Sequence, residues 1–194
     1  MLKFIKVSFF AGGMLLLAHA NAQELYVFTE PASNMPAKSI SAKVTGRFMK
    51  ATGASRTMQR YSPEIMFGVS RNWMIHLSPG FSNMFTSNVR WESAKLYTKY
   101  RFFTDDEVHR HFRMAAFGEA AYSRNDPHFD ELNLDGDQGG IQGGVILTQL
   151  TNKFALSSTL SVLRVLQEQS KIELANTPKQ AFNYTVSAGF LVLP

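Results

Sequence analysis

Two short stretches of this sequence gather residue types that can bind metal ions. The stretch HRH places His109 and His111 on one face of an extended chain, beside Asp105, Asp106 and Glu107. Neutral imidazoles near carboxylates can bind zinc or copper, but two histidines without a fixed third ligand are a weak signal. We therefore expect a solvated turn at this point, and the sequence predicts no metal there.

The loop DPHFDELNLDGD, residues 126–137, is the second such stretch, and its carboxylates could gather calcium through oxygen ligands. The acids are Asp126, Asp130, Glu131, Asp135 and Asp137. The loop lacks the spacing of the helix-loop-helix calcium motif, since DGD stands at its end rather than at its start. A hydrophilic outer loop is the simpler interpretation, and we predict no cofactor.

Catalysis would need a nucleophile or a base beside a suitable partner. Ser123 and His128 lie close together in the sequence, and acids follow them. No G-x-S-x-G elbow, H-E-x-x-H helix or P-loop accompanies them. We predict that the protein is not an enzyme, and activity at the rim of a barrel is the least favoured alternative.

Nine charged residues occupy the polar positions of extended, alternating segments. They are Lys43, Arg47, Arg60, Glu64, Lys95, Lys99, Arg101, Arg113 and Glu119. If their face lines a narrow lumen, these charges must pair, because an isolated ion there carries a large desolvation cost. We expect a structural salt-bridge network that fills the lumen. The alternative is a basic constriction that selects anions, which needs a wider pore than about eight strands provide.

The elements that position these charges are strands. Apolar and polar residues alternate over 40–48, 62–70, 73–81, 94–102, 112–122, 141–148, 154–162 and 182–192. A period of two indicates a strand with one apolar and one polar face. The pattern predicts about eight strands of roughly 10–14 residues, where roughly 9–11 suffice to cross a bilayer obliquely and soluble domains use about half that length.

The predicted connections alternate in length. Short ones fall at 70–72, 103–110 and 150–152, and longer ones at 50–55, 83–89, 123–138 and 166–180. Outer-membrane barrels show this rhythm, with tight periplasmic turns and longer outer loops. The pattern therefore places both termini on the periplasmic side.

Alternation alone does not decide which face meets water, because a soluble lipocalin-like barrel turns its apolar row inward and a transmembrane barrel turns it towards lipid. Strand length, a polar row rich in Ser, Thr, Gly and Ala, and aromatic residues near the strand ends favour lipid. Those aromatics are Trp73, Phe102, Phe112, Phe154 and Phe190 near the short connections, and Phe48, Phe81, Tyr122, Phe182 and Tyr184 near the long ones. Trp91 has the polar parity, so we expect it to point inward or to lie above the membrane.

Residues 1–22 have the order of a secretory signal peptide: Lys3 and Lys6, then VSFFAGGMLLLA, then AHANA with cleavage after Ala20 or Ala22. An N-terminal anchor or a buried first helix is the alternative. Residues 23–194 are then one β-barrel domain. The chain has no cysteine and a formal charge of +5, so the sequence predicts neither a disulfide framework nor a nucleic-acid partner.

The segments EPASNMPAKSI (30–40), QRYSPEIMFGVSRNWMIHL (59–77), WESAKLYTKYRF (91–102) and YTVSAGFLVLP (184–194) resemble an uncharacterised family of bacterial outer-membrane β-barrel proteins. The resemblance spans nearly the whole mature chain and implies a barrel and its location, without any assigned catalytic or binding residue. Members of that group tend to continue with further strands beyond the position of LVLP. This chain ends on Pro194, so either eight strands close or the chain is part of a larger barrel.

Together these patterns predict an all-β, antiparallel up-and-down transmembrane β-barrel of about eight strands in the outer membrane of a Gram-negative cell. The expected role is structural, or a narrow, porin-like passage for small solutes whose identity the sequence does not specify. Outer-membrane lipid and the barrel-assembly machinery are the expected partners. The alternative from another class is an exported soluble lipocalin-like barrel that binds an apolar ligand.

Overall fold

The computed structural model describes residues 30–50, 56–125, 132–167 and 179–190. The predicted signal peptide, residues 1–22, lies outside the described residues, and so do positions 126–131 of the acidic loop. No helix in the described ranges is long and apolar enough to cross a membrane.

The described chain forms one antiparallel sheet in which every strand pairs with its neighbours in sequence. The strands are β1 (Ile40–Met49), β2 (Met58–Gly68), β3 (Trp73–Ser82), β4 (Arg90–Asp106), β5 (Arg110–Ser123), β6 (Gly140–Thr151), β7 (Phe154–Val165) and β8 (Gln180–Phe190). Six strands contain a whole alternating segment. β2 ends two residues before its segment does, and the last two residues of the segment in β8 lie outside the described residues. The match is expected when one face of a pleated strand is apolar and the other polar. The predicted all-β, antiparallel up-and-down fold is confirmed.

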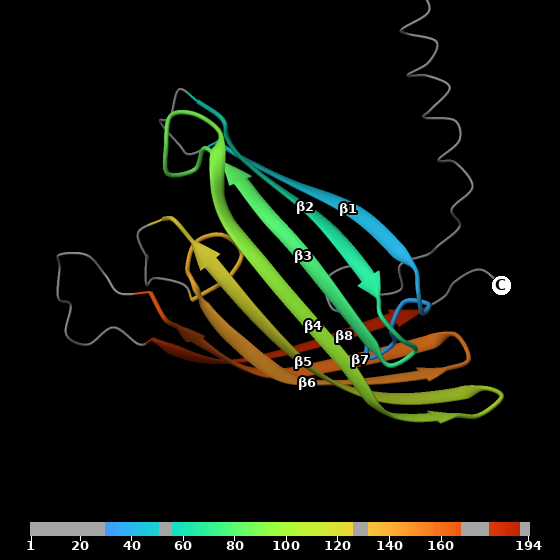
Figure 1. The fold of residues 1–194 in the computed structure, drawn as a ribbon. Helices are drawn as coiled ribbons and strands as arrows, with labels where there is room; N and C mark the ends of the chain where they lie inside the picture. The colour runs from blue at the N-terminus through green and yellow to red at the C-terminus, as the bar shows by residue number, and fades with distance from the viewer. Residues whose placement is uncertain (1–29, 51–55, 126–131, 168–178, 191–194) are drawn as a thin grey trace, which may run out of the picture.

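The connections also follow the predicted rhythm. Turns of a few residues join β2 to β3, β4 to β5 and β6 to β7, while longer connections join the other pairs. The three short turns therefore lie at one end of the sheet, here called the short-turn end. The longer connections lie at the opposite end, here called the long-loop end (Figure 1).

The sheet curls through part of a cylinder (Figure 1), and its two outermost strands remain edges. Within the described ranges β1 pairs with β2 and β8 pairs with β7, but β1 and β8 do not pair with each other. The structure is a half-barrel, so closure by eight strands is not observed.

The apolar row of the strands is on the outer, exposed face. Phe182, Val186 and Phe190 of β8 keep 66%, 63% and 66% of their surface accessible, whereas Lys99 and Arg60 on the opposite face keep 0% and 4%. A folded chain that dissolves in water normally shows the reverse arrangement, because apolar surface is driven out of water.

A β-bulge in β4 changes one expected placement. Gly80 pairs with Ser93 and Phe81 pairs with Trp91, so Glu92 is an extra residue in the ladder. Of the two expected placements of Trp91, the inward one is wrong, because the bulge reverses the parity of the strand before it. Its position relative to a membrane stays a prediction. The Trp91 ring lies instead beside Tyr122, with ring centroids 6.0 Å apart and nearly parallel planes.

Two segments outside the strands cover the inner face. Residues 30–36 lie near the short-turn end, where Ala32 packs with Ala115 and Ile146. Residues 132–139 turn back over the inner face near the long-loop end, where Leu134 packs with Leu163 and Val165. Small apolar clusters thus fix both segments among otherwise polar neighbours. We call these segments the N-terminal cover and the loop cover.

Candidate functional site on the inner face

The nine charged residues selected from the sequence divide into three groups along the inner face. Arg47, Arg60, Lys95 and Glu119 lie towards the loop cover, Lys43 and Glu64 lie in the middle, and Lys99, Arg101 and Arg113 lie towards the short-turn end. They form separate local pairs rather than one continuous network.

The loop cover places a carboxylate between two strands of the inner face. Asp135 accepts hydrogen bonds from the Arg47 guanidinium and from the Lys95 ammonium, each at 2.9 Å. Lys95 also lies 3.6 Å from the Glu119 carboxylate. Burial would raise the pKa of Asp135, but Lys95 and Arg47 outweigh it and hold that pKa at about 2. The loop is therefore attached to β1 and β4 by charge.

Arg60 on β2 is the centre of a more deeply buried group. Its Nε donates to Glu92 and its second guanidinium nitrogen donates to Asp137, both at 2.5 Å. The Glu92 carboxylate also accepts from the Asn125 amide at 2.9 Å. Gly136, between the two loop acids, has a φ of 102°, which glycine adopts without the strain that a side chain would introduce. Two of the three guanidinium nitrogens of Arg60 are thus paired with acids.

The middle of the inner face holds an acid and an imidazole. Glu64 lies 3.2 Å from Nδ1 of His76, and Lys43 is its register partner on β1. The His76 and Tyr97 rings lie 4.9 Å apart, and His76 Nε2 and the Tyr97 hydroxyl are buried without a hydrogen-bond partner among the described residues. A buried water is the usual occupant of such a position.

The short-turn end joins Lys99 to the N-terminal cover. The ammonium donates to the Glu30 carboxylate at 2.8 Å and to the carbonyls of Pro31 and Ser33 at 2.6 and 2.9 Å. Arg113 donates to the Ser33 hydroxyl at 2.8 Å. The side chain of Lys99 has no accessible surface.

Arg113 is also held from the opposite side by Asp106, whose carboxylate accepts from two of its guanidinium nitrogens at 3.0 and 3.2 Å. Arg101 behaves differently, because it donates to the Arg71 carbonyl and to the Asn72 side chain in the turn between β2 and β3. Arg101 therefore fixes a turn and takes no part in the pairs that hold the covers.

Several acids that complete these pairs are absent from the set selected from the sequence: Glu30, Glu92, Asp135 and Asp137. That set contains seven cations and two acids, and buried charges must be compensated. The imbalance is itself a signal that acids must come from outside the alternating positions. The bulge that turns Glu92 inward leaves no comparable signal.

The candidate metal groups take other roles. The ring of His111 lies 3.0 Å from the Asp106 carboxylate, and His109 is exposed in the turn. Two acids expected in a hydrophilic outer loop, Asp135 and Asp137, instead turn inward to bind cations. No group of three or more His, Asp or Glu side chains in the described ranges is arranged to hold a metal ion.

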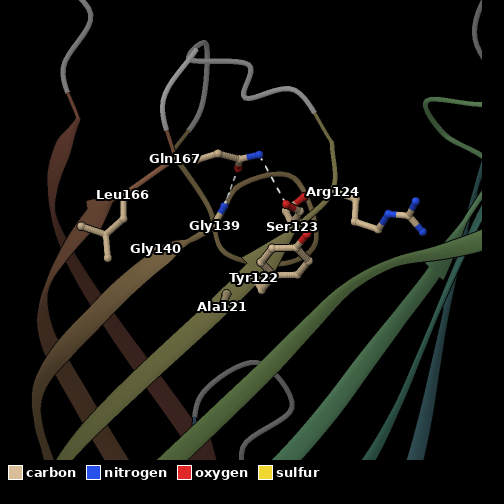
Figure 2. Close-up of a pocket in the computed structure, with 8 residues that line it drawn as sticks. All are labelled: Ala121, Tyr122, Ser123, Arg124, Gly139, Gly140, Leu166 and Gln167. Atoms are coloured by element: carbon tan, nitrogen blue, oxygen red, sulfur yellow. Dashed lines mark hydrogen bonds between the residues drawn. The ribbon is translucent and has the colours of Figure 1, made fainter. Parts of the chain in front are cut away.

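The expected neighbours Ser123 and His128 do not form an observable pair, because His128 lies outside the described residues. The Ser123 hydroxyl donates to the Gly136 carbonyl at 2.9 Å, so it fixes the loop cover. A recess of about 520 Å³ adjoins it at the long-loop end (Figure 2). The recess is lined by Ala121, Tyr122, Ser123, Arg124, Gly139, Gly140, Leu166 and Gln167.

The recess contains no acid and base side by side. The amide of Gln167 crosses it, accepting from the Gly139 N–H at 2.9 Å and donating to the Ser123 carbonyl (Figure 2). The same amide also donates to the Asn125 carbonyl. Gln167 therefore joins the end of β7 to the loop cover. Comparison with known proteins adds no role for either region, since no family model, curated protein or solved structure matches the chain.

Proposed function

We propose that the chain is an integral outer-membrane β-barrel protein. Its role is structural, or it forms a narrow passage for small solutes along the inner face of the sheet. The observation that carries this proposal is the exposed apolar outer face. Ile40, Val44 and Phe48 on β1 and Phe182 to Phe190 on β8 extend that face to both edges of the sheet. An apolar surface of this extent is costly in water and stable in lipid.

The contents of the inner face also favour this proposal over an exported soluble barrel. A lipocalin-like protein needs an apolar cavity to hold its ligand. Here the corresponding side carries buried Arg60, Glu92 and Lys99, and its hydroxyls are buried as well. Charged groups in those positions would make an apolar ligand's burial unfavourable.

The two covers support a structural role in the conformation described. The N-terminal cover closes the short-turn end by way of Lys99, and the loop cover closes the long-loop end by way of Arg60 and Lys95. A small polar cavity of about 100 Å³ lies beside Asp135, between Glu64 and Ser93. A passage would therefore require one cover to move.

A pair of matched substitutions tests the membrane proposal. Val186 on β8 and Val108 in the turn between β4 and β5 are both exposed, at 63% and 87%. In lipid, Val186→Lys should lower the free energy of unfolding by about 2–4 kcal/mol, because a cation on the lipid face loses its hydration. Val108→Lys should change it by less than about 0.5 kcal/mol.

The measurement is urea unfolding of the chain reconstituted in phospholipid vesicles, together with its recovery in the outer-membrane fraction after expression. A water-soluble protein would tolerate both lysines equally and would stay dissolved without detergent. Equal effects of the two substitutions would therefore contradict the proposal.

A further inference from the structure

The N-terminal cover lies against the sheet without being part of it. Residues 31–36 adopt no strand, and prolines at positions 31 and 36 lack the N–H that a ladder needs. A side chain at position 68 would clash with the Pro36 carbonyl, so Gly68 allows the cover to approach β2 closely. The cover can therefore leave the inner face without breaking the hydrogen bonds between strands.

What holds the cover is a cation that supplies hydrogen bonds to oxygen atoms. The ammonium of Lys99 has three N–H donors, and the cover provides three acceptors in the Glu30 carboxylate and the carbonyls of Pro31 and Ser33. No part of the Lys99 side chain is exposed. If the cover leaves, Lys99 loses all three acceptors at once.

The neighbours of Lys99 would then form a recess with donors on several sides. Arg113 keeps its orientation through Asp106 and points one guanidinium nitrogen at the position of Ser33. The Thr148 hydroxyl, which now accepts from the Ala32 N–H, stays 3.1 Å from the Ser157 hydroxyl. Lys99, Arg113 and the hydroxyls of Thr148 and Ser157 would line the recess, and Asp106 is the acid beside Arg113.

We propose that this recess is a binding site for small carboxylate anions, and that the chain's own Glu30 and two carbonyl oxygens fill it while the cover is in place. A carboxylate offers the two oxygen acceptors that an ammonium and a guanidinium recognise best. The site is narrow, because one extended segment occupies it. The inference rests on the proposed function in one respect: small carboxylates would be the solutes of the proposed passage.

Asn34 provides a reporter for the position of the cover. Both polar atoms of its side-chain amide are buried without a hydrogen-bond partner among the described residues, so Asn34→Cys removes no hydrogen bond there. The chain has no other cysteine. The rate at which a charged maleimide labels this thiol therefore measures how often the cover leaves its recess.

The experiment compares sodium acetate with sodium chloride at equal ionic strength. Acetate should accelerate labelling several-fold and saturably, because it competes with Glu30 for Lys99. Lys99→Met should give fast labelling in both salts with no response to acetate. Lys95→Met is the matched control, since Lys95 lies on the same strand but pairs with Asp135 and Glu119, and it should keep the response to acetate.

A milder variant covers the case in which Lys99→Met fails to fold. Glu30→Gln leaves Lys99 in place and removes the internal competitor, so half-maximal acceleration should need less acetate. Equal labelling in the two salts would overturn the inference, and so would fast labelling that neither acetate nor Glu30→Gln changes.

The assay is independent of the membrane proposal, because it can be run in vesicles, in detergent or in buffer, whichever keeps the chain folded. If Val186→Lys is no more harmful than Val108→Lys, the membrane proposal fails while the labelling still decides the anion site. If the lysine pair behaves as expected and acetate has no effect, only the anion site fails.

Discussion

The two ends of the inner face neutralise their cations in different ways. At the long-loop end, Arg60 and Lys95 meet carboxylates on β4, on β5 and on the loop cover, which is joined to a strand on each side. At the short-turn end, Lys99 depends on Glu30 and on carbonyls of a cover that precedes the first strand. Both covers contact several strands, but the loop cover is continuous with a strand at each end, whereas the N-terminal cover is continuous in the described residues with one strand, β1.

This difference suggests which end could open. Removing the loop cover would leave Arg60 paired with Glu92 but would expose Leu134 and its apolar neighbours. Removing the N-terminal cover exposes less apolar surface, since Ala32 is its buried apolar contact. The free energy gained by burying a side chain grows with its apolar area. Uncovering the short-turn end therefore costs less free energy than uncovering the long-loop end.

The largest effect should come from breaking the charge group at the long-loop end. Arg60→Met leaves Glu92, of which 1% is accessible, without its cation, and should lower the free energy of unfolding by about 3–5 kcal/mol. Urea titration measures the loss, with Arg110→Met at the exposed start of β5 as the control. A loss no larger than that of the control would mean that this end is not fixed by its charges.

A smaller loss, about 1–3 kcal/mol, is expected for Lys99→Met at the short-turn end. The substitution removes a buried cation as well as its hydrogen bonds, and Glu30 is 42% accessible, so its carboxylate can return to water. The same titration gives the value. If Lys99→Met cost as much as Arg60→Met, the two ends would be equally fixed and the contrast between them would fail.

The strands were predictable from sequence because a period of two records which side chains share a face. Every alternating segment lies wholly or mostly within a strand, and the outer face contains the expected apolar row. The charges were harder to place. Periodicity shows that Lys99 and Arg60 share the inner face, but it does not show that their partners come from residues 30–36 and 132–139.

The bulge in β4 marks the limit of period-based prediction. One extra residue, Glu92, reverses the parity before it, so Trp91 lies on the outer face and Glu92 on the inner one. A bulge is set by the pairing of two strands and by local space beside Gly80, where a Cβ would meet the Ser93 side chain. The alternation of apolar and polar residues along a single strand indicates neither the pairing nor the local space.

A substitution on the outer face of the short-turn end tests whether the strands at that end are themselves weakly held, or only the N-terminal cover. There, Nε1 of Trp73 donates to the Thr98 hydroxyl at 2.7 Å, which accounts for a polar residue in the apolar row. Thr98→Val should cost about 0.5–1.5 kcal/mol, as expected for one hydrogen bond. Thr98→Ser, which keeps the hydroxyl, is the control for unfolding in urea. A negligible loss would indicate that the end is loose beyond its cover.

The smallest effect is a dependence on pH that only the long-loop end should show. The pKa of Asp135 is about 2 in the folded chain and 3.8 as the reference value, so ionisation of this acid stabilises the fold. The contribution is complete above the reference pKa and is lost as the pH falls towards 2.

Because the Asp135 side chain is 45% accessible, solvent screening should limit its contribution to about 0.2–1 kcal/mol. Asp135→Asn should lower the free energy of unfolding by that amount at neutral pH and should match the unsubstituted chain well below pH 2, where the Asp135 carboxyl is protonated in the folded chain. Unfolding titrations at several pH values test this. A full-sized difference that persists well below pH 2 would mean that Asp135 acts through packing, so that the loop cover, like Ala32 in the N-terminal cover, would be held by contacts rather than by charge.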